Sequence, residues 1–143
     1  MNFGSINWLA ILVCVVVNMI VGFIWYNPKT FFPVWWKGIG KSESDVPGTG
    51  GSMGMTWALT VFASFVQAVF MSLMVTAMGS MMPGGATLVS GMTAGAILWS
   101  GFVAPTSLVN KLFAGHGLKI WAIEAGNHLV TFVLFGAILG AWR

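Results

Sequence analysis

The stretch that decides the fold of this chain is residues 118–142, LKIWAIEAGNHLVTFVLFGAILGAW. Beyond Lys119 its single fully charged residue is Glu124, and most of the others are apolar. A helix needs about 20 mostly apolar residues to cross the hydrocarbon core of a bilayer. The whole chain is 57% hydrophobic and 6% charged, whereas a soluble domain carries about a quarter charged residues. The stretch therefore predicts a membrane-spanning helix, and the composition excludes a water-soluble globule.

Three other segments meet the same criterion of length and hydropathy. They are residues 6–26, 55–78 and 86–110, and Asn-Pro or Pro-Gly-Gly sequences follow the first two. Backbone N–H and C=O groups in lipid must be paired within the segment, so all four spans are expected to be helices. The sequence thus predicts an all-α fold, an integral membrane four-helix bundle, formed as a single membrane domain over residues 1–143.

The loops carry most of the positive charge. The loop of residues 27–54 begins with an aromatic, lysine-containing segment, residues 31–37, typical of the membrane interface. It ends in a flexible glycine-rich linker, residues 48–54. Five of the six basic residues lie in or beside this loop and the loop of residues 111–117: Lys29, Lys37, Lys41, Lys111 and Lys119. Because Lys and Arg concentrate on the cytoplasmic side, we predict a multi-pass protein of the cell (inner) membrane with both loops cytoplasmic and both termini outward.

Four polar side chains fall at a similar depth in the four spans. A rise of about 1.5 Å per residue places each of them roughly 12–15 Å from its cytoplasmic helix end, near the middle of a hydrocarbon core about 30 Å thick. They are Asn18, Gln67, Ser100 and His128. Polar groups avoid lipid, so these side chains are expected to face one another inside the bundle. The candidate polar core or pathway comprises these four with Ser64, Asn110, Glu124 and Asn127.

Glu124 and His128 are four residues apart, so their side chains lie on the same helix face and can touch. One interpretation is a pair that handles protons or ions, because histidine titrates near neutral pH and burial tunes a carboxylate. The other is a hydrogen-bonded pair that only fixes helix packing, with Glu124 leaning toward Lys119 or Lys111 at the interface. Ionisable residues inside a membrane favour the first interpretation, and interhelical polar contacts favour the second.

Small residues at four-residue spacing predict close helix packing. Gly91 and Gly95 lie in the third span, and Gly136 and Gly140 lie in the fourth. Such spacing lets two backbones approach closely, either within the bundle or between subunits of an oligomer. Pro105 lies near the end of the third span and frees a backbone carbonyl one turn earlier. We favour a plain kink there over an opened backbone that lines a cavity.

No motif of the common enzyme or cofactor families is present. There is no H-E-x-x-H, G-x-S-x-G or P-loop pattern, so we expect no enzymatic activity, no cofactor and no metal site. A weak Cu(I) candidate is the run Met74, Met78 and Met82, because thioethers are soft ligands. Flexible apolar filling is the favoured interpretation of these methionines. The small net charge of +3 gives no reason to expect nucleic-acid binding.

Several segments resemble the small bacterial membrane proteins catalogued as domain of unknown function 1761. The resemblance is carried by residues 22–28 (GFIWYNP), residues 101–106 (GFVAPT) running on to Asn110, residues 124–129 (EAGNHL) and residues 136–140 (GAILG). It covers nearly the whole chain. It implies a four-helix membrane bundle and does not imply an activity, because the family has no established biochemical role.

Two functions from different classes fit these features. The first is a transporter or channel for a small solute or ion, with proton coupling as one form of it, based on the polar layer and the Glu124–His128 pair. Four helices enclose little space, so we expect a homo-oligomer to form the path. The alternative is a non-catalytic accessory or structural subunit of a larger membrane complex, based on the aromatic helix surfaces and the absence of catalytic motifs.

Overall fold

The computed structural model describes residues 3–48 and 52–142, and within these ranges every regular element is helical. The prediction of an all-α fold is confirmed. In chain order the elements are η1 (Phe3–Ser5), α1 (Trp8–Trp25), α2 (Phe32–Gly38), α3 (Met53–Gly79), α4 (Leu88–Leu98), η2 (Trp99–Val103), α5 (Ala104–Phe113) and α6 (Gly117–Ala141).

Four helical segments are long and apolar enough to cross a membrane, as predicted. They are α1, α3, the continuous run Leu88–Phe113 and α6. The third of these differs from a plain helix, because η2 is one π-helical turn between α4 and α5. Pro105 has no N–H, and the Ala104 N–H instead bonds the carbonyl of Trp99, five residues back. The proline therefore produces a π-bulge rather than a plain kink.

Polar side chains cap the helices where the chain enters lipid. The Asn7 side chain accepts a hydrogen bond of 3.1 Å from the Ala10 N–H at the start of α1. Ser52 caps α3 in the same way. Thr87 and Ser90 form a reciprocal capping box at the start of α4. Each cap satisfies a first-turn donor that would otherwise be unpaired.

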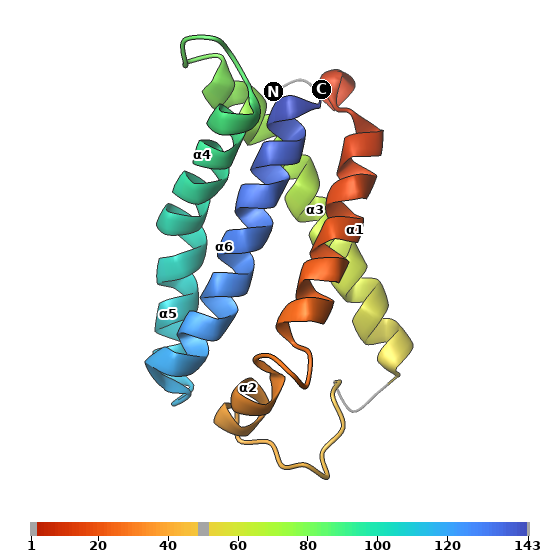
Figure 1. Ribbon diagram of the computed structural model, residues 1–143, viewed down its shortest axis with the longest axis vertical. Helices are drawn as coiled ribbons and strands as arrows, with labels where there is room; N and C mark the ends of the chain where they lie inside the picture. Colours follow the sequence, from red (N-terminus) through yellow and green to blue (C-terminus); the bar gives the residue numbers. More distant parts are fainter. Residues whose placement is uncertain (1–2, 49–51, 143) are drawn as a thin grey trace.

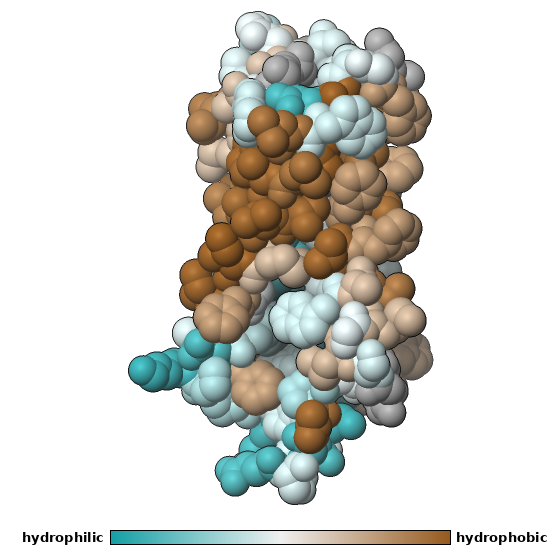
Figure 2. Space-filling model, turned by 90° about the vertical axis from the view of Figure 1, so that its right-hand side faces the viewer, coloured by the Kyte–Doolittle hydropathy of each residue, from teal (hydrophilic) through white to brown (hydrophobic). Residues whose placement is uncertain are grey.

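α6 is the central helix of the bundle, in contact with α1, α2, α3, α4, η2 and α5. Both chain termini and the α3–α4 turn lie at one end of the molecule, while α2 and the α5–α6 turn lie at the other (Figure 1). The loops of residues 27–54 and 111–117 therefore share one end. On the face drawn in Figure 2, apolar side chains form a broad belt in the half nearer the termini, and hydrophilic ones gather at the loop end.

The aromatic segment after the first span forms the short helix α2, which packs against the start of α6. Gly38 makes this contact possible, because a Cβ atom there would overlap the side chain of Ile120. The Phe32 and Trp36 rings stack with centroids 5.4 Å apart. Gly48, the first residue of the expected linker, has φ of 127°, whereas residues 49–51 of that linker lie outside the described residues.

The two pairs of glycines meet at the contact between α4 and α6. A Cβ atom at Gly91 would overlap the carbonyl oxygen of Gly136, and one at Gly136 would overlap that of Gly91. Gly95 lies against the Phe132 carbonyl, and Gly140 lies against the Thr87 carbonyl. Backbone cannot move aside as a flexible side chain does, so glycine is required at these positions. The structure therefore places all four glycines inside one bundle.

Gly91→Ala is expected to destabilise the protein by about 1–3 kcal/mol, because the added methyl group must push two helix backbones apart. The measurement is unfolding in mixed detergent micelles, followed by circular dichroism. Gly22→Ala is the matched control, since a Cβ atom at Gly22 meets nothing within 4 Å. That variant should be neutral or stabilised by up to about 1 kcal/mol through helix propensity. Equal effects of the two changes would contradict the packing described here.

Candidate functional site: the polar face of α6

Tryptophan side chains form hydrogen bonds that connect the neighbouring elements to α6. The Trp25 indole N–H donates to the Ile123 carbonyl at 2.8 Å, and the Trp99 N–H donates to the Ala125 carbonyl at 2.8 Å. Gly126 makes room for Trp25, whose ring lies 3.0 Å from where a Cβ atom would be. An indole N–H in lipid has no water to bond, so a backbone carbonyl of a neighbouring helix takes that place.

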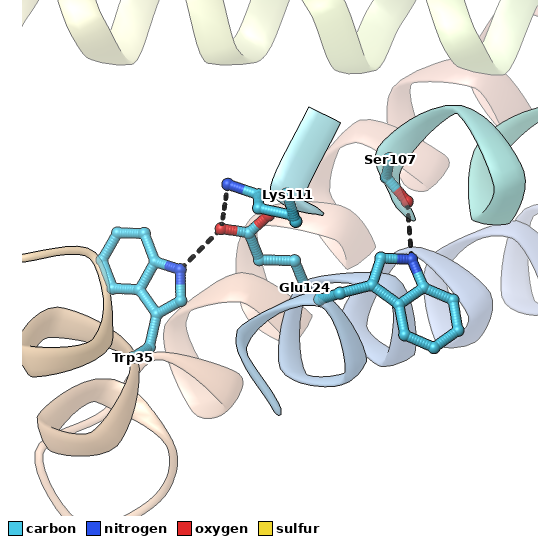
Figure 3. A network of polar contacts seen from close by, with 5 residues as sticks. Trp35, Ser107, Lys111 and Glu124 are labelled. Carbon is cyan, nitrogen blue, oxygen red and sulfur yellow. Dashed lines mark hydrogen bonds and ion pairs between the residues drawn. The ribbon is translucent and has the colours of Figure 1, made fainter. Parts of the chain in front are cut away.

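Glu124 is the centre of a network that joins three elements. Its Oε1 atom lies 2.8 Å from the Lys111 Nζ atom of α5 and accepts a hydrogen bond of 2.8 Å from the Trp35 indole of α2. Lys111 and Trp35 approach the carboxylate from different sides (Figure 3). The Lys111 and Glu124 side chains are only 21% and 16% exposed. Partial burial strengthens the attraction between the two charges relative to a surface ion pair.

The network shows which residues the Glu124 carboxylate contacts. The carboxylate faces Lys111 and Trp35, and the described contacts include no hydrogen bond between Glu124 and His128. The arrangement matches the interpretation in which Glu124 leans toward Lys111. His128 is half-buried one turn further along the same helix. A direct Glu124–His128 pair is therefore not what this conformation contains.

A second polar contact anchors the end of the third span. The Trp121 indole N–H donates to the Ser107 hydroxyl and to the Ala104 carbonyl, both at 3.1 Å. The Ser107 hydroxyl itself donates to the Ala104 carbonyl. The Ser107 hydroxyl thus bonds the carbonyl of Ala104, the residue directly before Pro105, and not the carbonyl one helical turn before the proline. This contact fixes α5 against α6 below the π-helical turn.

Deeper in the bundle, Thr131 and Asn18 connect α6 to α1. The Thr131 hydroxyl, which is 1% exposed, donates to the Asn18 side-chain oxygen at 3.1 Å. Counting residues from the helix ends predicted instead that Asn18 lies at the same depth as His128. The difference arises because α1 ends at Trp25, which lies beside Ile123 rather than beside the start of α6. Asn18 therefore meets α6 about one helical turn further from the loop end than the residue count predicted.

Two buried polar atoms in the interior have no hydrogen-bond partner among the described residues. They are Nδ2 of Asn127 and Oγ of Ser64, whose residues are 7% and 1% exposed. Helical rise places both about 15–17 Å from the loop-side starts of α6 and α3. Asn127 is one turn from Thr131 on the same face of α6. Unpaired buried polar atoms are uncommon and require an explanation.

Ser100 and Asn110 lie elsewhere, and their assignment to the polar core is wrong. Ser100 is exposed on the π-helical turn, and its hydroxyl donates to the Ala96 carbonyl at 2.8 Å. This bond to the preceding turn satisfies the hydroxyl, so the side chain can face lipid. Asn110 is exposed near the end of α5. Depth alone did not specify which side of the helix each residue occupies.

Gln67 lines an apolar groove between α3 and the π-helical turn. The groove has a volume of about 290 Å³ and includes Phe70, Phe102, Val103 and Phe132 in its walls. Gln67 is half-buried there. Of the eight predicted polar residues, the structure thus places Asn18, Ser64, Asn127 and His128 within or beside the interior and Glu124 at its loop end.

The methionine run does not share one helix face. α3 ends at Gly79, so Met82 lies in the following turn and helical spacing does not bring it over Met78. Met78 packs against the apolar core, and Met74 lines the groove beside Gln67. These placements match apolar filling. The described residues also hold no group of three or more His, Cys, Asp or Glu side chains close enough to bind a metal ion.

The residues that make most of the interhelical hydrogen bonds are absent from the set predicted from the sequence. They are Trp25, Trp35, Trp99, Trp121 and Thr131. A signal was available, because the chain has eight tryptophans and each carries a donor that lipid cannot satisfy. The acceptors were not visible in the sequence, since three of them are backbone carbonyls.

Taken with the polar face of α6, the four apolar helical segments define a multi-pass helical membrane protein. The chain belongs to the family described as protein of unknown function (DUF1761), whose model matches residues 9–140. The family resemblance found in the sequence is confirmed. No curated protein and no solved structure matches the chain.

Trp35→Phe is expected to loosen α2 from α6, because it removes a hydrogen bond to a charged acceptor worth about 1.5–3 kcal/mol. Hydrogen–deuterium exchange of the amides in residues 32–38 should become faster, while exchange in the centre of α6 stays unchanged. Trp57→Phe is the control, since Trp57 is 54% exposed on α3. If exchange in α2 does not change in the Trp35 variant, the indole–carboxylate bond does not hold this helix.

Proposed function

We propose that the protein moves a small polar solute or an ion across the bilayer, as a transporter or channel with the polar face of α6 as its path. The observation that carries this proposal is the Nδ2 atom of Asn127, which has no hydrogen-bond partner among the described residues and is buried at mid-depth near the Thr131–Asn18 contact. A buried unpaired donor costs about 1–3 kcal/mol. A membrane helix retains such a group when a transient partner, such as a passing solute, uses it.

The Glu124 network supports a path that closes at the loop end. Glu124 lies one turn before Asn127 and His128 on α6, with Lys111 and Trp35 bound to its carboxylate. Movement of α2 would remove Trp35 and expose the carboxylate to water. A carboxylate that exchanges partners in this way can bind a cation or a proton, which gives a physical basis for proton coupling.

Two copies of the chain would provide more room for a path than one bundle does. The four packing glycines are used within a single bundle, so a homo-oligomer would need another surface. The exposed apolar faces of α1 and α3 are available for that contact or for lipid. The alternative function, a non-catalytic subunit of a larger complex, uses the same faces and predicts that the chain alone supports no flux.

Purified protein in liposomes is expected to raise the flux of at least one member of a panel of protons, K⁺, Na⁺, Cl⁻, urea and glycerol. Asn127→Leu should reduce that flux at least about tenfold, because it removes the donor and keeps the branched shape of the side chain. It should also leave folding stability unchanged or higher, since it removes an unpaired polar group from the interior. A residue with a purely structural polar contact would show the opposite change in stability.

Ser100→Ala is the matched control, because the Ser100 hydroxyl bonds its own helix and faces outward. Its flux should equal that of the wild type. Glu124→Gln and His128→Ala then separate transport itself from its coupling to protons. A variant that retains flux but loses the pH dependence of flux assigns proton coupling to the residue it replaces. Wild-type liposomes with no more flux than protein-free liposomes would refute the transport proposal and favour the accessory-subunit alternative.

We further propose that the protein lies in the cell (inner) membrane with both termini outward and the loops of residues 27–54 and 111–117 cytoplasmic. The distribution of lysines supports this orientation. In a variant with Cys14 replaced by alanine, Ser44→Cys should resist a membrane-impermeant maleimide added to intact cells, whereas Met81→Cys should react. Both positions are exposed and lie at opposite ends of the bundle. The reverse pattern of labelling would show the opposite orientation.

A further inference from the structure

A basic groove lies at the loop end of the molecule, between α2 and the start of α6. Its volume is about 450 Å³, and it is separate from the polar face of α6. Three of its lining residues carry nitrogen atoms that can bind an anion: Lys37, His116 and Lys119. The remaining lining residues are Pro33, Val34, Gly38 and Ile120, and no acidic side chain is among them.

The positive charges of this groove are not neutralised within the described chain. The ion pair formed there is Lys111 with Glu124, and neither Lys37 nor Lys119 pairs with a carboxylate among the described residues. The Nδ1 atom of His116 is buried and has no partner among the same residues. Unpaired cations and a buried nitrogen on one groove wall favour an anionic ligand with several oxygen acceptors.

The backbone adds to this positive potential. His116 is the N-cap residue of α6, and its side chain makes no capping hydrogen bond. Among the described residues, no N-cap side chain therefore bonds the first N–H groups of this 25-residue helix, whose first turn includes Lys119. A helix N-terminus attracts phosphate through its dipole and its free N–H groups. Here it reinforces a site that the two lysines and His116 already define.

The groove is also expected to lie at the surface of a membrane, because α2 is the aromatic, lysine-containing segment predicted for the interface. The tight contact of Gly38 with Ile120 holds α2 against α6. Pro33, Val34 and Ile120 give the groove an apolar wall on which acyl chains can lie. A soluble phosphate would use the cationic wall alone, whereas a phospholipid would use both walls.

We propose that this groove binds the phosphate-bearing headgroup of an anionic phospholipid. Lys37 and Lys119 contact the phosphate oxygens, His116 supplies a further polar contact, and the acyl chains lie along Pro33 and Val34. Basic pockets between membrane helices are suited to such headgroups. The bound lipid would bridge α2 and α6 and so stabilise the position of α2.

The test is native mass spectrometry of the full chain in detergent, titrated with phosphatidylglycerol or phosphatidylcholine. We expect wild-type protein to retain phosphatidylglycerol in preference to phosphatidylcholine. The double variant Lys37→Gln/Lys119→Gln should weaken phosphatidylglycerol binding at least about tenfold, the loss expected for charge-assisted hydrogen bonds. Lys37→Arg/Lys119→Arg should retain binding, because arginine keeps the charge and the donors.

Lys29→Gln/Lys41→Gln is the matched control. It removes the same charge from exposed positions of the same loop, outside the groove, and should weaken binding less than about threefold through screened attraction. Equal losses in the two double variants would overturn the proposal in favour of general surface attraction. Equal retention of both lipids by wild-type protein would also overturn it. Displacement of the lipid by inorganic phosphate at equal concentration would assign the groove to a soluble anion instead.

Discussion

The structure depends on one constraint: inside the hydrocarbon core, every polar group must find its partner within the protein. α6 provides most of these partners. Its backbone carbonyls at Ile123 and Ala125 accept indole N–H groups from α1 and η2, and its Glu124 carboxylate accepts one from α2. The helix that contacts all the others is thus also the one that satisfies their donors. The same helix therefore provides both the packing contacts and most of the hydrogen-bond acceptors of the bundle.

The end of α6 nearer the chain termini packs in a different way. Toward the chain termini it holds glycines rather than polar acceptors, and the α4 and α6 backbones come into direct contact. Close backbone contact is favourable in lipid because it needs neither a hydrophobic effect nor a side-chain partner. The bundle is therefore closely packed between α4 and α6 near the termini, while the loop end contains tryptophans, an ion pair and the basic groove. The polar contacts of α6 thus extend from Glu124 near the loop end to Thr131 just past the middle of the helix.

The loop end combines two features that a function can use. The Glu124 network connects α2, α5 and α6 through contacts that change if α2 moves. The basic groove lies on another side of α2, where a lipid headgroup could affect the same movement. Asn127, whose Nδ2 atom has no partner among the described residues, lies about one helical turn beyond Glu124 on α6. A short interfacial helix that touches both sites is therefore the element through which the membrane surface and the interior would communicate.

The sequence by itself determined the solvent, the helical class, the four spans and the family, because length, hydropathy and local motifs are properties of single segments. It also identified the four packing glycines, and it singled out Glu124, which forms an ion pair with Lys111. The tertiary structure decided the partners: Lys111 and Trp35 rather than His128 for Glu124, Thr131 for Asn18, and the Ala96 carbonyl of its own helix for Ser100. Such pairings depend on the relative rotation and depth of helices, which arise from packing between segments. A count of residues along one helix does not contain that information.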